Sequence, residues 1–178
     1  IFDYRGYGRS QGSPDESGTY ADARAAWSYL TTHLAIPPGR ILFFGRSLGG
    51  AVAVELATRH RPAAVLLESV FTSAPDLGAR VYPWLPVRLL ARIHYDSTKR
   101  MSEVPGPKLF IHIVDDEIVP LDQGRRLFEL AREPRDFLEI RGGHNDGFLV
   151  SEPAYRAGLA SFLDGLTVPP DSVINTTG

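Results

Sequence analysis

The stretch Ile41-Leu42-Phe43-Phe44-Gly45-Arg46-Ser47-Leu48-Gly49-Gly50 decides the fold. Its first four residues are apolar and predict a short buried strand, and the residues from Leu48 to His60 predict a helix. Between the two lies a Gly-x-Ser-x-Gly motif centred on Ser47. A serine on a sharp strand-to-helix turn has a strained backbone and is exposed above the end of a sheet, and small neighbours make room for it. We therefore expect Ser47 to be a nucleophile.

The same motif occurs a second time, at Gly8-Arg9-Ser10-Gln11-Gly12. The pattern alone is weak evidence, so its structural context has to decide. This copy leads into Ser13-Pro14-Asp15, which cannot be the interior of a helix. We expect Ser10 to be a loop serine that hydrogen-bonds to nearby backbone.

Outward from Ser47, apolar strand-like runs alternate with helix-like segments along the whole chain. Strands are expected at Ile1–Tyr4, Ile41–Phe44, Ala64–Leu67, Leu109–Val114 and Phe137–Ile140, and helices at Thr19–Leu34, Leu48–His60, Leu121–Ala131 and Ala154–Leu166. This alternation predicts the α/β class, with a mostly parallel sheet covered by helices on both faces. We expect one core domain over residues 1–166 and a loose polar tail over residues 167–178.

Residues from about 74 to 100 interrupt the alternation with apolar side chains and prolines. We expect a small helical insertion at the sheet edge. Ordinary packing would explain its apolar side chains, and so would a lid whose Tyr82 and Trp84 touch the acyl or alkyl group of a substrate.

Composition excludes several functional classes. The 178 residues include 19 basic and 21 acidic side chains, a net charge of −2, which argues against nucleic acid or an anionic membrane as the main partner. The absence of cysteine excludes disulfide scaffolds, thiol catalysis and cysteine-based zinc sites. We expect no metal and no cofactor. We also expect a cytoplasmic protein, although the chain opens without Met, which leaves a signal peptide or membrane anchor upstream open, as it does the oligomeric state.

A serine hydroxyl needs a base to take its proton, and five histidines compete for that role. His144 lies in Gly142-Gly143-His144-Asn145-Asp146, a loop that follows the strand expected at Phe137–Ile140. Such a loop can carry an imidazole over the end of the sheet, so we expect His144 to be the base. The other four fall near helix ends, inside the insertion or inside a strand, namely His33, His60, His94 and His112.

The base in turn needs a carboxylate to fix its tautomer. The strand expected at Leu109–Val114 ends in Asp115-Asp116-Glu117, and Glu68 follows the strand at Ala64–Leu67. Adjacent side chains point in different directions, so we expect only one of the three consecutive acids to serve the histidine. The residues themselves leave Asp115, Asp116 and Glu68 open.

These motifs resemble the α/β-hydrolase superfamily, and most closely its α/β-hydrolase-domain branch, which includes depalmitoylases and serine-aminopeptidase-like members. The resemblance spans positions 3 to 146 and rests on four segments: Asp3-Tyr4-Arg5-Gly6-Tyr7-Gly8-Arg9-Ser10, Gly45-Arg46-Ser47-Leu48-Gly49-Gly50, His112-Ile113-Val114-Asp115-Asp116-Glu117-Ile118-Val119-Pro120 and Gly143-His144-Asn145-Asp146. It implies a triad in the chain order Ser47, Asp116, His144. It also implies that the backbone N–H of Leu48 is an oxyanion donor.

The resemblance also implies that the chain is truncated at its N-terminus. In that fold Ile1–Tyr4 would be the fourth of eight strands, and the third would lie between it and Ile41–Phe44. We therefore expect an open apolar edge on Ile41–Phe44. The loop after the third strand would supply a second oxyanion donor, and the loss of one donor costs about 10²–10³ in rate.

The function expected from these residues is hydrolysis of a carboxylic ester or thioester through an acyl-enzyme on Ser47. A small-molecule or acylated substrate is the expected partner, with Tyr4 and Arg46 at the mouth of the site. Two alternatives remain: a serine-aminopeptidase-like hydrolase, in which Asp146 or Glu117 would hold the substrate amine, and a truncated member without catalytic activity.

Overall fold

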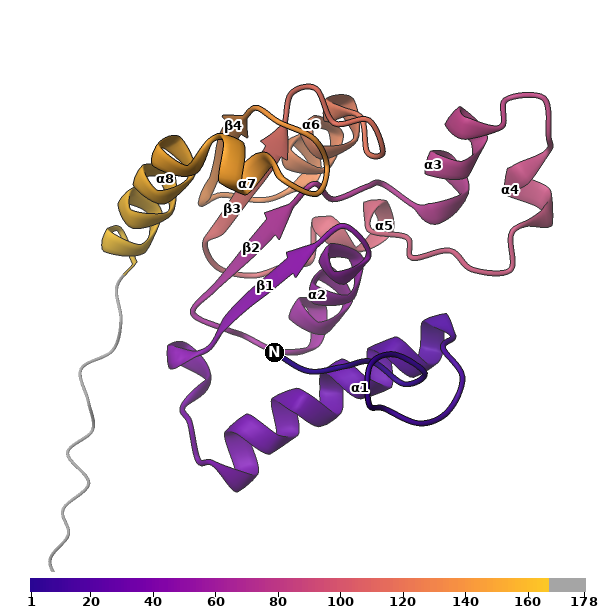
Figure 1. The fold of residues 1–178 in the computed structure, drawn as a ribbon. Coiled ribbons are helices and arrows are strands. Elements are labelled where there is room, and N and C mark those ends of the chain that lie inside the picture. Colours follow the sequence, from indigo (N-terminus) through magenta and orange to yellow (C-terminus); the bar gives the residue numbers. More distant parts are fainter. Residues whose placement is uncertain (167–178) are drawn as a thin grey trace, which may run out of the picture.

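A computed structural model of the chain describes residues 1–166 (Figure 1). Its sheet has the strand order β1-β2-β3-β4, with every neighbouring pair parallel. The strands are β1 (Leu42–Arg46), β2 (Ala64–Glu68), β3 (Lys108–Ile113) and β4 (Arg135–Ile140). All four therefore end at the same edge of the sheet, where the loops after them can meet.

The burial of each strand follows its place in the sheet. Every residue of β2 and β3 is buried, as in strands covered on both faces. On β1 the side chains alternate, and Leu42 and Phe44 are exposed. In the described residues β1 pairs only with β2, so its other edge carries no ladder. The open edge expected from the sequence is present.

Helices cover both faces of the sheet, as predicted. The larger core cluster joins one face to α1 (Glu16–Ser28), α2 (Leu48–Arg59) and α6 (Leu121–Leu130). On the other face lies α8 (Glu152–Asp164) (Figure 1). Its Phe162 belongs to the second core cluster, which also contains Ile111 of β3, and its Leu159 packs against that cluster. The α/β class and the two-sided covering are therefore confirmed.

Local signals explain most element boundaries. The helix expected from Thr19 begins earlier, at Glu16, because the Asp15 side chain accepts a hydrogen bond from the amide of Gly18 and caps it. It continues beyond Ser28 as a π-helix over Tyr29–His33, and a 3₁₀ turn over Pro38–Arg40 leads into β1.

The insertion contains three short helices, α3 (Ala74–Val81), α4 (Val87–Leu90) and α5 (Thr98–Met101). Helices α3 and α4 project away from the sheet (Figure 1). The remaining short helix, α7 (Gly147–Val150), follows the His144 loop. No helix among residues 1–166 is long and apolar enough to cross a bilayer. The tail expected at 167–178 lies outside the described residues.

The prediction of a strand at Ile1–Tyr4 is wrong. These residues form no ladder, and Ile1 and Phe2 are exposed. The segment is instead held by side chains: the amide of Arg9 donates to Asp3, and Arg5 pairs with Asp22 of α1 at 2.7 Å. A strand needs a hydrogen-bonding neighbour, and no described strand lies between this segment and β1 to provide one.

Candidate active site

Ser47 occupies the sharp turn between β1 and α2. Its φ of 51° and ψ of −120° lie in a region that is strained for a residue with a side chain. Its amide donates to the carbonyl of Glu68 at 2.9 Å, which ties the turn to the end of β2. A Cβ at Gly45 would lie 2.4 Å from the carbonyl oxygen of Gly49, so the first position of the motif has no room for a side chain. The turn has the form that the motif predicts.

His144 and Asp116 form a buried pair. The imidazole Nδ1 lies 2.8 and 2.9 Å from the two carboxylate oxygens. A carboxylate can only accept, so Nδ1 carries the proton and Nε2 is left as the acceptor. The amides of Ile118 and Val119 donate to the same carboxylate at 2.9 and 2.7 Å.

These hydrogen bonds decide the charge of Asp116. Burial alone raises the pKa of its carboxyl, but the two amides and the imidazole outweigh burial and hold the pKa below its usual range. Asp116 is therefore an anion at neutral pH. An anion against Nδ1–H fixes the tautomer and stabilises the imidazolium that forms if Nε2 takes a proton.

The three consecutive acids have three different partners. Asp115 is exposed and pairs with Arg141 on the surface at 3.2 Å. Asp116 takes the His144 ring. Glu117 accepts from the backbone amide of His144 at 2.9 Å. The sequence predicted one partner for the ring but gave no signal for the backbone contact of Glu117, because a contact between two loops leaves no local pattern.

Glu68 is not placed to serve His144. Its carboxylate is only 2% exposed and faces Arg46, at 3.3 Å from Nε, and Tyr155, whose hydroxyl donates to it at 2.8 Å. The alternative acid that the residues left open is thus paired with other groups.

Two of the remaining histidines and the second motif have ordinary structural roles. His112 is buried in β3, with Nε2 2.9 Å from the carbonyl of Val119, and burial lowers its pKa. His60 stacks on Trp27. The Ser10 hydroxyl donates to the backbone carbonyl of Asp3 at 2.9 Å, the loop role expected for it.

Two further predicted residues adjoin the turn at Ser47. Leu48 is the first residue of α2, so its amide belongs to the helix start, where amides have no partner within the helix. Tyr4 is partly buried against the core, and burial raises its pKa to about 12. Its hydroxyl lies beside Gly49, 3.8 Å from where a Cβ would stand.

Tyr82 and Trp84 lie between α3 and α4, and their rings meet edge to face at 6.2 Å. Both are exposed, Trp84 by 75%. Among residues 1–166 no hydrogen bond or ring contact joins either ring to Ser47, Asp116 or His144. Their role against an acyl group therefore stays a prediction.

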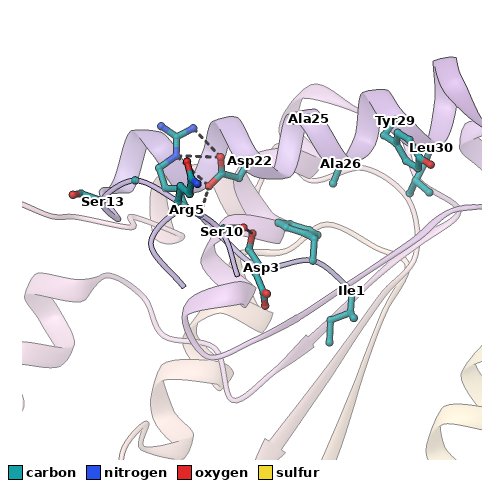
Figure 2. Close-up of a pocket in the computed structure, with 13 residues that line it drawn as sticks. Ile1, Asp3, Arg5, Ser10, Ser13, Asp22, Ala25, Ala26, Tyr29 and Leu30 are labelled. Atoms are coloured by element: carbon teal, nitrogen blue, oxygen red, sulfur yellow. Dashed lines mark hydrogen bonds and ion pairs between the residues drawn. The ribbon is translucent and has the colours of Figure 1, made fainter. Parts of the chain in front are cut away.

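One hollow of the described residues is lined by none of Ser47, Asp116 and His144. It measures about 880 Å³ and lies between the N-terminal segment and α1, where Figure 2 shows Arg5 clasping Asp22. A second, apolar hollow of about 390 Å³ lies between the same segment and β1, with Trp27 and Phe44 in its wall. Only the second of these two hollows borders β1, beside the edge with which the N-terminal segment forms no ladder. Among residues 1–166 no cluster of His, Asp or Glu could hold a metal ion.

A model of the alpha/beta hydrolase family matches residues 1–170, nearly the whole chain. The chain belongs to the alpha/beta hydrolase family. The chain is 45% identical over 164 residues to an uncharacterized protein of Mycobacterium tuberculosis, covering 92% of this chain and 58% of that protein. It is 37% identical over 146 residues to human alpha/beta hydrolase domain-containing protein 17B, covering 82% and 49%. The chain thus spans about half the length of these relatives.

Solved structures carry the same fold. An alpha-beta hydrolase from Vibrio vulnificus superposes with a TM-score of 0.73 at 22% identity, over 90% of this chain and 61% of that one. A monoacylglycerol lipase from Paleococcus ferrophilus gives 0.65 at 19% identity, over 92% and 82%. At these identities the likeness concerns the fold alone.

Proposed function

We propose that this alpha/beta hydrolase cleaves a carboxylic ester or thioester through an acyl-enzyme on Ser47. One observation carries the proposal: Asp116 engages Nδ1 of the buried His144 ring, which leaves Nε2 as the basic nitrogen, and Ser47 sits on its strained turn at the end of β1. Membership of the family supports hydrolysis in general, and the triad order supports a serine nucleophile.

The reaction follows from these groups in two halves. As Ser47 Oγ bonds to the carbonyl carbon, its proton passes to Nε2 of His144, and the carbonyl oxygen becomes an anion stabilised by the Leu48 amide. When the tetrahedral intermediate collapses, the bond to the alcohol or thiol breaks and that group takes the proton from Nε2. Water then attacks the acyl-enzyme in the same way, which releases the acid and restores Ser47.

The aminopeptidase alternative is less well supported by this site. It requires carboxylates that are free to hold a substrate amine. Glu117 is engaged with the amide of His144, and Asp146 accepts from the amide of Gly143 at 2.7 Å. Both acids are used to shape the loop, which favours an ester or thioester over a peptide with a free amine.

A fluorophosphonate probe tests the proposal, read by intact mass after checking by circular dichroism that the protein is folded. The duplicated motif supplies a matched pair of variants, Ser47→Ala and Ser10→Ala. We expect one adduct on the wild type and on Ser10→Ala, and none on Ser47→Ala. A folded wild-type chain that takes no adduct would contradict catalysis by this chain and would favour a non-catalytic member.

Replacement of His144 tests the base. His144→Ala removes the imidazole, so we expect labelling of Ser47 to slow by about 10²–10⁴-fold. A folded variant that labels at the wild-type rate would contradict the role of His144.

A further inference from the structure

Glu68 joins the nucleophile turn to a second set of contacts. Its backbone carbonyl accepts the amide of Ser47, while its buried carboxylate pairs with Arg46 and accepts the hydroxyl of Tyr155. A carboxylate removed from water needs such partners, and an unpartnered one would be costly. Glu68 therefore holds the Arg46 side chain against the end of β2.

Arg46 reaches from this anchor to the loop that carries the base. Its Nη2 donates to the backbone carbonyl of His144 and lies 3.4 Å from Oδ1 of Asn145. Its guanidinium also lies over the ring of Phe148, 5.7 Å from the centroid. The Arg46 side chain thus contacts both the buried carboxylate of Glu68 and three of the residues that follow β4.

These contacts complement those of the two acids. Asp116 orients the His144 ring, Glu117 binds the backbone amide of His144, and Arg46 binds its carbonyl. The peptide groups on both sides of His144 are thus held. A planar guanidinium can serve acceptors in two directions at once, which an ammonium cannot do equally well.

We propose that Arg46, anchored by Glu68, is a positioning residue that fixes the height of the His144 loop above Ser47. The inference rests on the proposed function of Ser47 and His144. It assigns Arg46 a role toward the base, in addition to the expected place of Arg46 at the mouth of the site, which stays a prediction.

The first variant is Arg46→Met, which keeps much of the stem and removes the charge and the donors. A misplacement of about 1 Å can cost about 10²-fold in rate, so we expect Ser47 labelling to slow by about 10- to 100-fold. Arg24→Met is the matched control, because Arg24 pairs at 3.4 Å with another buried carboxylate, Glu55, away from the loop. The control should label at the wild-type rate.

A second variant separates positioning from stability. Arg46→Met leaves the Glu68 carboxylate buried without its cation, which lowers stability by itself. The double variant Arg46→Met/Glu68→Gln removes that charge and should recover melting temperature without recovering the labelling rate. Recovery of both would overturn the proposal, because Arg46 would then serve stability only. Arg46→Lys should restore part of the rate, and a rate no better than that of Arg46→Met would contradict positioning by the cation.

Proton NMR gives a readout that does not need activity. The His144 Nδ1 proton, held by Asp116, should give a far-downfield resonance in the wild type and exchange faster with water in the double variant. An unchanged resonance together with unchanged labelling would overturn the inference. If the wild type takes no adduct but its resonance still responds to the double variant, the proposed hydrolysis fails while the positioning contact stands.

Discussion

At the scale of single residues, three neighbouring carboxylates show how position decides function. Asp115, Asp116 and Glu117 differ little in chemistry, yet one pairs with a surface arginine, one with an imidazole and one with an amide. Only Asp116 is held ionised by several donors. The role of each acid thus depends on its partner.

Replacement of each acid by its amide should separate these roles. Asp116→Asn keeps the shape but can reverse the His144 tautomer, so we expect labelling of Ser47 to fall by about 10³–10⁴-fold. Asp115→Asn should label at nearly the wild-type rate, because its ion pair is exposed. Rate constants for probe labelling measure both, and equal losses in the two variants would contradict the assignment.

The sequence was sufficient for two members of the proposed triad. The strand and helix on either side of Ser47, and the glycines beside His144, are local patterns that the structure reproduces. Asp116 could be singled out only through family resemblance, because nothing local distinguishes it from its neighbours. The contacts of Glu68 and Arg46 join residues far apart in the chain, and no local pattern predicts them.

At the scale of elements, packing between strand and helix is tight where β3 meets α6. Gly124 of α6 faces the buried ring of His112, whose Nε2 is hydrogen-bonded to the Val119 carbonyl. A Cβ at Gly124 would lie 2.2 Å from Nδ1 of that ring. The ring is held in place, so it cannot easily move aside.

Two glycine substitutions test this packing. Alanine in a helix interior is favoured over glycine by about 1 kcal/mol. At Gly124 the clash should outweigh this gain and destabilise the fold by about 1–3 kcal/mol. A Cβ at Gly49 in α2 would lie 3.8 Å from the hydroxyl oxygen of Tyr4, so Gly49→Ala should not destabilise the fold. Chemical denaturation compares the two, and a Gly124→Ala protein as stable as wild type would refute the contact.

Contact between the insertion and an acyl chain is a prediction, and the fluorescence of Trp84 can test it. Trp27 is buried in the core whereas Trp84 is exposed, so a change in emission on labelling reports mainly on Trp84. A long-chain alkyl phosphonate on Ser47 should shift the emission to shorter wavelength, and an ethyl phosphonate should not. Identical spectra for the two adducts would contradict contact between this segment and an acyl chain.

At the scale of the whole molecule, the two central strands of the sheet are buried, whereas the edge strand β1 exposes side chains and pairs on one side only. The central strands were predictable because a continuous apolar run indicates burial on both faces. The conformation of Ile1–Tyr4 was not predictable, because an apolar segment forms a strand only if another strand lies beside it. The side chains of Leu42 and Phe44 are exposed on β1, and the apolar hollow lies beside them.

The stability of the whole fold in acid also depends on its buried titratable groups, because their contributions add. The folded-state pKa values of His112 and Asp116 are both lowered, so the unfolded chain takes up their protons at higher pH. Each residue therefore contributes fully to the free energy of unfolding above its pKa in the unfolded chain, which is about 6.5 for histidine and 3.9 for aspartate. The contribution is lost as the pH falls below that value. The melting temperature should drop as pH is lowered from neutral.

His112→Gln tests the first part of that drop. The amide can still donate to the Val119 carbonyl but does not titrate. We expect the fall in melting temperature between about pH 7 and pH 5 to become shallower in this variant. An unchanged slope would show that His112 does not contribute.

The adjacency of Arg46 and Ser47 in the chain has a mechanical consequence. If the end of β1 moves, it moves Ser47 and Arg46 together, and Arg46 moves the loop that follows β4 through its hydrogen bond to the His144 carbonyl. Ser47 and His144 then share the displacement, so the distance between them changes less than the position of either. If the two residues react as proposed, this link would keep their reacting atoms aligned without requiring a rigid sheet.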